Sequence, residues 1–136
     1  MWYYWLMKTI FEKIIDGEIP ATKVYEDDKC LAFLDIHPQA KGHVLLVPKE
    51  KVGRIQLVPD DLLQYLILQS KKLILVMIQS LNCDYVQVEI VGKGVPDHFH
   101  MHLIPRMNDE HVPESEYKQY EEGEKELLAE KIKARL

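Results

Sequence analysis

Cysteine is scarce in this sequence: the 136 residues include only Cys30 and Cys83. Two isolated cysteines give neither the disulfide framework of a small secreted domain nor the paired spacing of a zinc-binding motif. We therefore interpret both as small buried residues of a protein in a reducing compartment. The expected location is the cytoplasm.

The sequence has no apolar run long enough to cross a membrane, because a spanning helix needs about 20 mostly apolar residues. The aromatic stretch at residues 1–7 is short and lacks the basic start of a signal peptide. We expect it to form a strand or arm that packs on its own domain or on a partner chain. The apolar stretch 59–81 is interrupted by polar residues at 69–72, which predicts a largely buried helix and no membrane partner.

Positive charge is not in excess: the sequence has 17 Lys and Arg residues and 22 Asp and Glu residues, for a net charge of −5. This balance excludes broad electrostatic binding of nucleic acid, although a few local cations can still hold a small anionic ligand. The composition, 47% hydrophobic and 29% charged, is that of an ordinary globular protein. The length suggests a single domain with one substantial core.

Histidine is concentrated instead: three of the six histidines lie within five positions, at His98, His100 and His102. They alternate with apolar residues, and a period of two is the side-chain period of a β-strand. On such a strand the three imidazoles share one face, about 6.7 Å apart. Phe99 and Leu103, like Met101 between them, would then point into a core. A row of titratable groups on one face indicates a function.

The rest of the chain predicts elements around this row. The expected elements are a short helix at 9–16, strands at 23–26, 30–36 and 43–47, a long helix at 59–81, a strand at 84–91, a tight loop at 92–97, the histidine strand, and a helix at 121–135. This order predicts an α+β domain, an antiparallel sheet with the long helix and the C-terminal helix packed on it. We expect one domain over 1–136, with its core at about 9–106 and an acidic tail at 107–136.

Histidines in this arrangement suit phosphoryl or nucleotidyl transfer. Neutral imidazole is a nucleophile near neutral pH, because its unperturbed pKa is about 6.5. A central histidine that attacks phosphorus and later leaves divides a difficult transfer into two easier steps. Its neighbours can bind phosphate oxygens and the departing group. Gly92 and Gly94 would let the backbone approach a phosphate, although a plain hairpin turn explains two loop glycines equally well.

Metal binding is the competing interpretation of the row, since histidines two apart on a strand can chelate one ion. On a regular strand His98 and His102 lie about 13 Å apart, too far to share an ion. A metal would therefore use two of the three histidines and, with them, His43. No Asp or Cys has a spacing that completes a four-ligand set, so we predict no metal site.

The row His98-x-His100-x-His102, followed by two apolar residues, resembles the histidine triad (HIT) motif. The likeness extends from about Thr9 to Arg106. The upstream segments are similar to the nucleoside phosphoramidate hydrolase (Hint-like) branch of the family, and they are Phe11–Ala21, Val24–Asp28, Leu31–Ile36, Pro38–Ala40 and Gly42–Lys49.

The resemblance implies a homodimer with a HIT-like fold, no cofactor, and a purine nucleotide in a cleft over the sheet. His100 would be the nucleophile that becomes adenylylated, and His102 would contact the α-phosphate. His98 and His43 would support the imidazole row and the leaving group, with His98 as a proton donor. Asp35 would hold the ribose hydroxyls.

Two further groups of binding residues follow from the same resemblance. Phe33, Ile36 and Ile14 would surround the base, and the backbone at Gly92 and Gly94 would take up charge on the phosphate. A homodimer also agrees with the long helix, which is too apolar for a free surface.

The sequence departs from the family pattern beside the row. The family often has Gln four residues before the triad and Asn near the end of the preceding strand, where this chain has Gly94 and Ile90. The side-chain part of the phosphate clamp therefore differs. Asp97 adds a negative charge next to the row, where it could orient a histidine and raise its pKa.

A second departure concerns zinc. Many relatives in this branch carry two cysteines near the first helix and a histidine after the Pro-Lys pair, where this chain has Thr9, Glu12 and Lys51. Threonine and lysine are poor zinc ligands, and one glutamate cannot build a tetrahedral site. We therefore predict that no structural zinc is present.

Two classes of function follow from these observations. The first is an enzyme that cleaves adenosine 5′-phosphoramidate or a related nucleoside 5′-phosphate derivative through a nucleotidyl-histidine and releases AMP. A dinucleoside polyphosphate hydrolase is the nearest alternative within this class. The second is a non-catalytic nucleotide-binding or interaction protein that retains the fold. The complete triad favours the enzyme.

Overall fold

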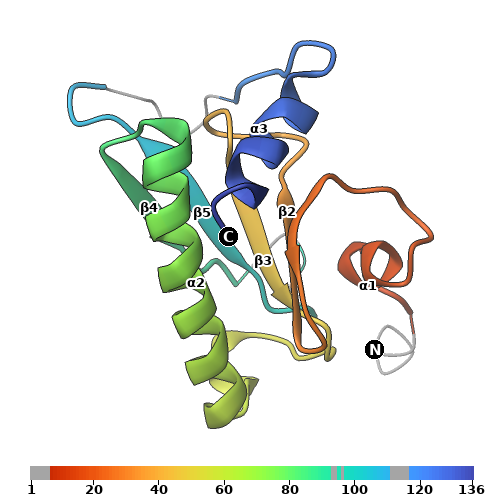
Figure 1. Ribbon diagram of the computed structural model, residues 1–136. Coiled ribbons are helices and arrows are strands. Elements are labelled where there is room, and N and C mark those ends of the chain that lie inside the picture. The colour runs from red at the N-terminus through yellow and green to blue at the C-terminus, as the bar shows by residue number, and fades with distance from the viewer. Residues whose placement is uncertain (1–6, 93–94, 96, 111–116) are drawn as a thin grey trace.

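The protein is built on a five-stranded antiparallel sheet (Figure 1) in the strand order β1-β2-β3-β5-β4. The computed structural model describes residues 7–92, 95, 97–110 and 117–136. The strands are β1 (Lys23–Glu26), β2 (Cys30–Leu34), β3 (Val44–Pro48), β4 (Tyr85–Glu89) and β5 (Met101–Arg106). The helices are α1 (Ile10–Ile15), α2 (Asp60–Leu81) and α3 (Glu124–Lys133), with a 3₁₀ turn at Ile55–Leu57. The α+β architecture predicted from the sequence is confirmed.

Local sequence signals explain where the helices begin and end. Thr9 caps α1, and its side chain and that of Glu12 form a reciprocal capping box. Pro59 is the N-cap of α2, one position before its predicted place, and two aspartates follow in the first turn. Asn82 ends α2 in the left-handed conformation, with φ of 57°.

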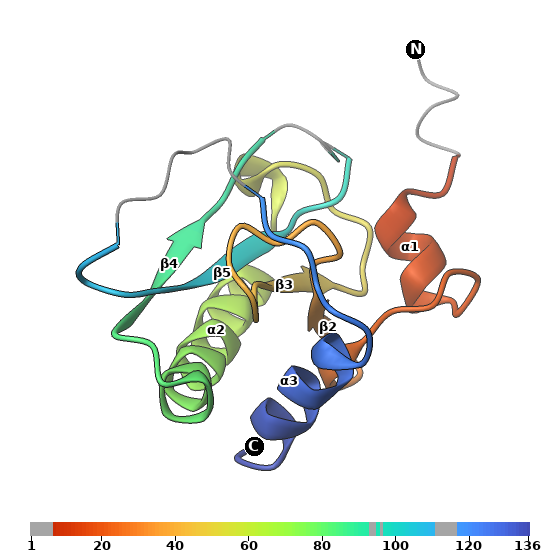
Figure 2. The ribbon, with the colours of Figure 1, turned by 90° about the horizontal axis from the view of Figure 1, so that it is seen from above.

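The sheet has apolar side chains on both faces, and the two faces differ. Figure 2 shows α2 and α3 together on one side of the sheet and α1 apart from them. The larger core lies under α2 and α3 and includes Phe99, Met101 and Leu103, as the alternation predicts. On the face toward α1, a smaller cluster comprises Phe11, Ile14, Leu31, Phe33, Leu45 and Val47. The histidine row belongs to this second face.

The histidine strand is shorter than the sequence predicts. β5 begins at Met101, so His98 and His100 precede it. The ladder between β3 and β5 ends at the pair Leu46 and Met101. Beyond it the carbonyl of Pro48 accepts a hydrogen bond from the His98 ring instead of from a backbone N–H. The prediction that all three histidines lie on one regular strand is therefore wrong, although their shared face is confirmed.

Smaller differences concern other strand ends and the cysteines. β2 ends at Leu34, so Asp35 and Ile36 lie in the following loop, and β4 ends at Glu89. Both cysteines are free and buried, as expected. Among the described residues, no helix combines the length and apolarity needed to cross a membrane. The expectation for residues 1–7 falls almost wholly on residues outside those described.

Candidate functional site

Four imidazole rings form a continuous line on the α1 face of the sheet. His100 and His102 have ring centroids 5.2 Å apart, and His102 and His43 have centroids 5.1 Å apart. Phe11 of α1 covers the other end, with its ring 5.0 Å from that of His100 and 5.7 Å from that of His98. His43, which the sequence alone would place as a strand-end polar residue, therefore extends the row.

His98 uses both of its ring nitrogens within the protein. Nε2 lies 2.7 Å from the carbonyl oxygen of Pro48, so Nε2 carries the proton and donates. Nδ1 lies 3.1 Å from the hydroxyl oxygen of Thr9. The side chain is fully buried, and burial lowers its pKa. The geometry leaves His98 no free nitrogen for a leaving group, contrary to the proton-donor role expected for it.

His100 has the opposite arrangement, with one nitrogen bound and one available. Its Nδ1 lies 2.9 Å from the carbonyl oxygen of His98, and a carbonyl can only accept. Nδ1 therefore carries the proton, and Nε2 keeps its lone pair in the neutral ring. This is the tautomer that a nucleophilic imidazole needs.

At the other end of the row, His43 and His102 are bonded to each other. The backbone N–H of Gln39 donates to Nδ1 of His43 over 3.1 Å, so the His43 proton lies on Nε2. That Nε2–H donates to Nδ1 of His102 over 2.9 Å. His102 consequently carries its own proton on Nε2. Asp35 lies beside this pair, with a carboxylate oxygen 3.6 Å from Nε2 of His43.

Burial dominates the electrostatics of this end. It lowers the pKa of His43 to about 3, with further lowering by His102 and Arg106. Burial also lowers the pKa of His102, which Asp35 and Glu89 oppose. The pKa of the Asp35 carboxyl is raised by burial, although the backbone N–H of His37 donates to it. These shifts favour neutral imidazoles and the fixed pattern of protons described above.

Sequence reasoning missed Gln39 and Arg106, two residues that support His43. The guanidinium of Arg106 donates to the side-chain oxygens of Gln87 over 2.9 Å and of Gln39 over 3.1 Å. Arg106 is only 7% exposed. Arg106 lies four residues after His102, and side chains two or four positions apart on a strand share one face. That spacing is the signal that could have identified it.

The residues expected around the nucleotide fall into two groups. Phe33 and Ile14 are buried in the cluster of the α1 face, near the row. Ile36 is 62% exposed and lies in the loop after β2. Gly92 lies against the Arg54 side chain, whose Cδ would be 3.7 Å from an added Cβ. Gly94 lies outside the described residues.

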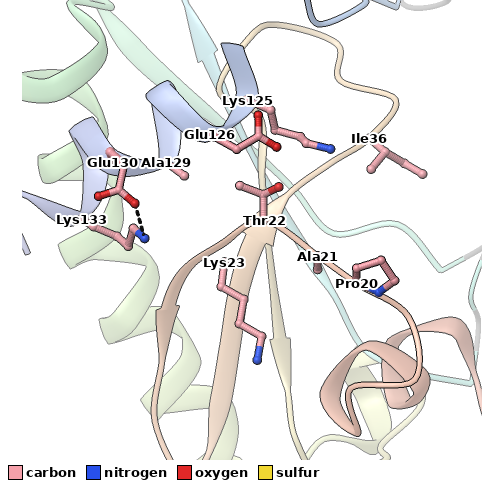
Figure 3. A pocket seen from close by; sticks show the side chains of 10 residues that line it. All are labelled: Pro20, Ala21, Thr22, Lys23, Ile36, Lys125, Glu126, Ala129, Glu130 and Lys133. Carbon is pink, nitrogen blue, oxygen red and sulfur yellow. Dashed lines mark ion pairs between the residues drawn. The ribbon is translucent and has the colours of Figure 1, made fainter. Parts of the chain in front are cut away.

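A cavity of about 560 Å³ lies between α3 and the chain around the start of β1 (Figure 3). Its lining residues are Pro20, Ala21, Thr22, Lys23, Ile36, Lys125, Glu126, Ala129, Glu130 and Lys133. None of these is a histidine, and several are charged residues of an exposed surface. The row therefore lies elsewhere, and among the described residues expected around the nucleotide only Ile36 lines this cavity.

Among the described residues, one group could hold a metal ion: the ligand atoms of Asp35, His43 and His102 lie within 4.8 Å of one another. A metal there would have to replace the hydrogen bond between the two imidazoles. The positions where relatives carry zinc ligands hold a different set. The backbone N–H of Thr9 donates to the Glu12 carboxylate over 2.9 Å, and Lys51 pairs with Glu12 at 3.4 Å. This donor set suits hydrogen bonds and an ion pair better than zinc.

Comparisons with known proteins agree on one family. Residues 16–109 match the family model described as HIT domain. The chain is 46% identical over 102 residues to an uncharacterized HIT-like protein of Methanocaldococcus jannaschii, covering 71% of this chain and 78% of that protein. It is 39% identical over 108 residues to an adenosine 5′-monophosphoramidase of Candida albicans, covering 74% and 71% respectively. A solved Hit-like protein involved in cell-cycle regulation, from Bartonella henselae, superimposes with a TM-score of 0.85 at 32% identity, covering 95% of this chain and 96% of that one.

Proposed function

Because the chain belongs to the HIT family, whose members similar to it include adenosine 5′-monophosphoramidases, we propose that it hydrolyses adenosine 5′-phosphoramidate or a related nucleoside 5′-phosphate derivative. The reaction releases AMP and passes through a nucleotide bound covalently to His100. The same residues suit the phosphates of a dinucleoside polyphosphate, which is the second substrate class.

The orientation of the His100 ring carries this proposal. Its Nδ1–H is held by the carbonyl of His98 at 2.9 Å, and Nε2 is therefore a lone-pair nitrogen without the need for a base. An imidazole held in this tautomer is ready to attack phosphorus. The covalent route requires this tautomer, so the constraint favours the catalytic function over nucleotide binding alone.

The reaction is written in two displacements. Nε2 of His100 attacks the α-phosphorus, a bond from nitrogen to phosphorus forms, and the bond to the leaving amine breaks as the amine takes a proton from solvent. Water then attacks the same phosphorus and gives up a proton to solvent, the phosphorus–imidazole bond breaks, and AMP leaves with neutral His100 restored. His102 carries an Nε2–H that can donate a hydrogen bond to a phosphoryl oxygen or to the departing nitrogen.

The remaining residues are assigned to support and binding. His98 and His43 hold the row in place, since their ring nitrogens bond to protein groups. Asp35 is proposed to accept hydrogen bonds from the ribose hydroxyls, with Phe33 and Ile14 beside the base. Ile36 can join them from its loop, and the backbone at Gly92 and Gly94 is assigned to the phosphate.

We further propose one HIT domain per chain and a homodimer formed through β4 and α2. β4 is the last strand in the order of the described sheet. Val88, Ile90, Leu68 and Leu75 nearby are each between 38% and 58% exposed. Pairing two such edges would cover these side chains, and a standard interface buries about 1,600 Å² in total. Sedimentation as a monomer at micromolar concentration would contradict this assembly.

The experiment that tests the function compares substrates on the purified protein. Adenosine phosphoramidate and a diadenosine polyphosphate are each incubated with it, and release of AMP is followed. A rapid alkaline quench, which preserves the acid-labile bond from phosphorus to nitrogen, is then analysed by intact-mass spectrometry. We expect turnover of the phosphoramidate and one adenylyl group per chain. Binding of AMP without turnover of either substrate would instead support the non-catalytic function.

A further inference from the structure

The hydroxyl of Thr9 has two bonds, one within α1 and one to the histidine row. It accepts the backbone N–H of Glu12 over 3.1 Å, as the N-cap of α1. The same oxygen lies 3.1 Å from Nδ1 of His98, a residue 89 positions away in the chain. A hydroxyl has one proton and two lone pairs, so it can accept the first bond and donate the second.

The direction of the second bond follows from the other side of the His98 ring. Nε2 must carry the proton, because its partner is the carbonyl of Pro48 at 2.7 Å. A neutral ring then has a lone pair on Nδ1, and the hydroxyl of Thr9 is its donor. Every polar atom of this fully buried ring is satisfied in one tautomer only.

The position of His98 matters to His100 through the backbone. The carbonyl of His98 accepts the Nδ1–H of His100 and so leaves Nε2 of His100 as the lone-pair nitrogen. Phe11, two residues after Thr9, also packs on both rings. The first turn of α1 therefore contacts the row twice, once through a hydrogen bond and once through an aromatic ring.

We propose that Thr9 is a positioning residue for the proposed reaction: its hydroxyl fixes the tautomer and place of His98, and thereby the carbonyl that orients His100. This assignment rests on the proposed function only for its kinetic consequence. Glu12 and Lys51 hold the start of α1 by separate contacts, because the Glu12 carboxylate accepts the Thr9 N–H and pairs with Lys51 just after β3. The short helix is thus tied to both the row and the end of β3.

Three substitutions of Thr9 separate its two roles. Thr9→Ser keeps a hydroxyl that can cap the helix and donate to His98. Thr9→Asp keeps a good N-cap, but its carboxylate has no proton to give and instead favours a protonated His98. Thr9→Val removes both functions. Glu12→Ala is the matched control, because it breaks the other half of the capping box and the pair with Lys51 while leaving the hydroxyl of Thr9 in place.

The first readout is the pair of imidazole ¹⁵N resonances of His98, measured in long-range ¹H–¹⁵N spectra. The ring resonances are assigned by linking them to the backbone resonances of His98. Wild type, Thr9→Ser and Glu12→Ala should show a neutral ring protonated at Nε2. Thr9→Asp should show both nitrogens protonated near neutral pH, and Thr9→Val should lose the single tautomer. If all five proteins give the same His98 resonances, Thr9 does not set the tautomer and the proposal is wrong.

The second readout is turnover of adenosine phosphoramidate. In Thr9→Val and Thr9→Asp, kcat should fall by about 10-fold with little change in KM, because a misplaced reacting group costs rate without loss of substrate contacts. Thr9→Ser and Glu12→Ala should both keep kcat near the wild-type value. An equal loss in Glu12→Ala and Thr9→Val would assign the effect to helix capping and overturn the proposal. If wild type itself is inactive, the proposed function fails, but the His98 resonances still decide whether Thr9 sets the tautomer. If Thr9→Val does not fold, the comparison of Thr9→Asp with Thr9→Ser decides the role of Thr9.

Discussion

The two ends of the histidine row are held in different ways. At the carbonyl end, formed by His98 and His100, each ring donates to a backbone carbonyl, over 2.7 and 2.9 Å. At the carboxylate end, formed by His43 and His102, the rings bond to each other over 2.9 Å beside Asp35. The ring N–H groups of the first end thus donate to backbone carbonyls, whereas the ring N–H of His43 donates to another side chain.

This difference separates two chemical tasks. A carbonyl can only accept, so the N–H that it binds stays in place through any change of protonation elsewhere. The carboxylate end is a coupled set in which the proton position on one ring depends on its neighbour. In the proposed reaction the nucleophile uses the first arrangement, and hydrogen bonding to the phosphate or to the departing nitrogen uses the second.

The largest expected effect is on the nucleophile of the carbonyl end. His100→Ala should reduce kcat for adenosine phosphoramidate by at least about 10³-fold, because the covalent route is lost. Steady-state turnover of wild type and variant, with AMP binding as the control for folding, measures this. Near-normal turnover by His100→Ala would exclude the mechanism whatever the fold.

The second prediction compares the ends by stability. His98→Ala leaves a cavity, and it leaves the buried Pro48 carbonyl and the partly buried Thr9 hydroxyl without their partner, so it should lower the free energy of unfolding by about 3 kcal/mol. His102→Ala removes a half-buried ring whose partner His43 has the Asp35 carboxylate 3.6 Å away as a second acceptor, and it should cost about 1 kcal/mol. Urea unfolding of both variants tests the contrast, and equal losses would mean that His98 has no special structural role.

The third prediction is a pH dependence that comes from the carboxylate end. Burial lowers the pKa of His43 to about 3 in the folded protein, so the unfolded chain binds more protons between that pH and about 6.5. Stability should therefore be complete above this window and fall by several kcal/mol as the pH falls through it. Burial shifts the pKa of His98 and His102 in the same direction.

The matched experiment is urea unfolding of wild type and His43→Asn at several pH values within that window. The variant lacks the His43 contribution, so its stability should fall less steeply toward acid. An unchanged slope in His43→Asn would show that His43 is not the source.

The smallest expected effect concerns binding beside the carboxylate end. Asp35→Asn keeps an oxygen that can accept from the backbone N–H of His37, but removes the charge. We expect KM for adenosine phosphoramidate to rise about 10-fold, or about 1.4 kcal/mol, with kcat nearly unchanged. Steady-state kinetics on a ribose-containing and a 2′-deoxy substrate measure this. A fall in kcat alone would place Asp35 in the chemistry of the row instead of in ribose binding.

Much of the fold followed from local pattern. Alternation placed Phe99, Met101 and Leu103 in the core, and Asn82 marked the end of α2. Such features depend on the side-chain period and on single-residue backbone preferences, which a sequence carries within a few positions. Strand ends followed less directly from the pattern, because a strand ends where its pairing ends: the ladder between β3 and β5 stops at Met101, although β3 itself continues to Pro48.

The sequence by itself determined that three histidines would share one face, because period two along the chain requires it. Only the tertiary structure decided what each ring does, since the tautomer of His98 depends on Pro48 and Thr9, 50 and 89 positions away in the sequence, and that of His43 depends on Gln39 in the loop after β2. Those contacts join α1, β3 and the loop after β2, and no local pattern encodes them. The nitrogen of His100 that keeps its lone pair is thus set by the fold, because the packing directs the backbone carbonyl of His98 toward the other ring nitrogen.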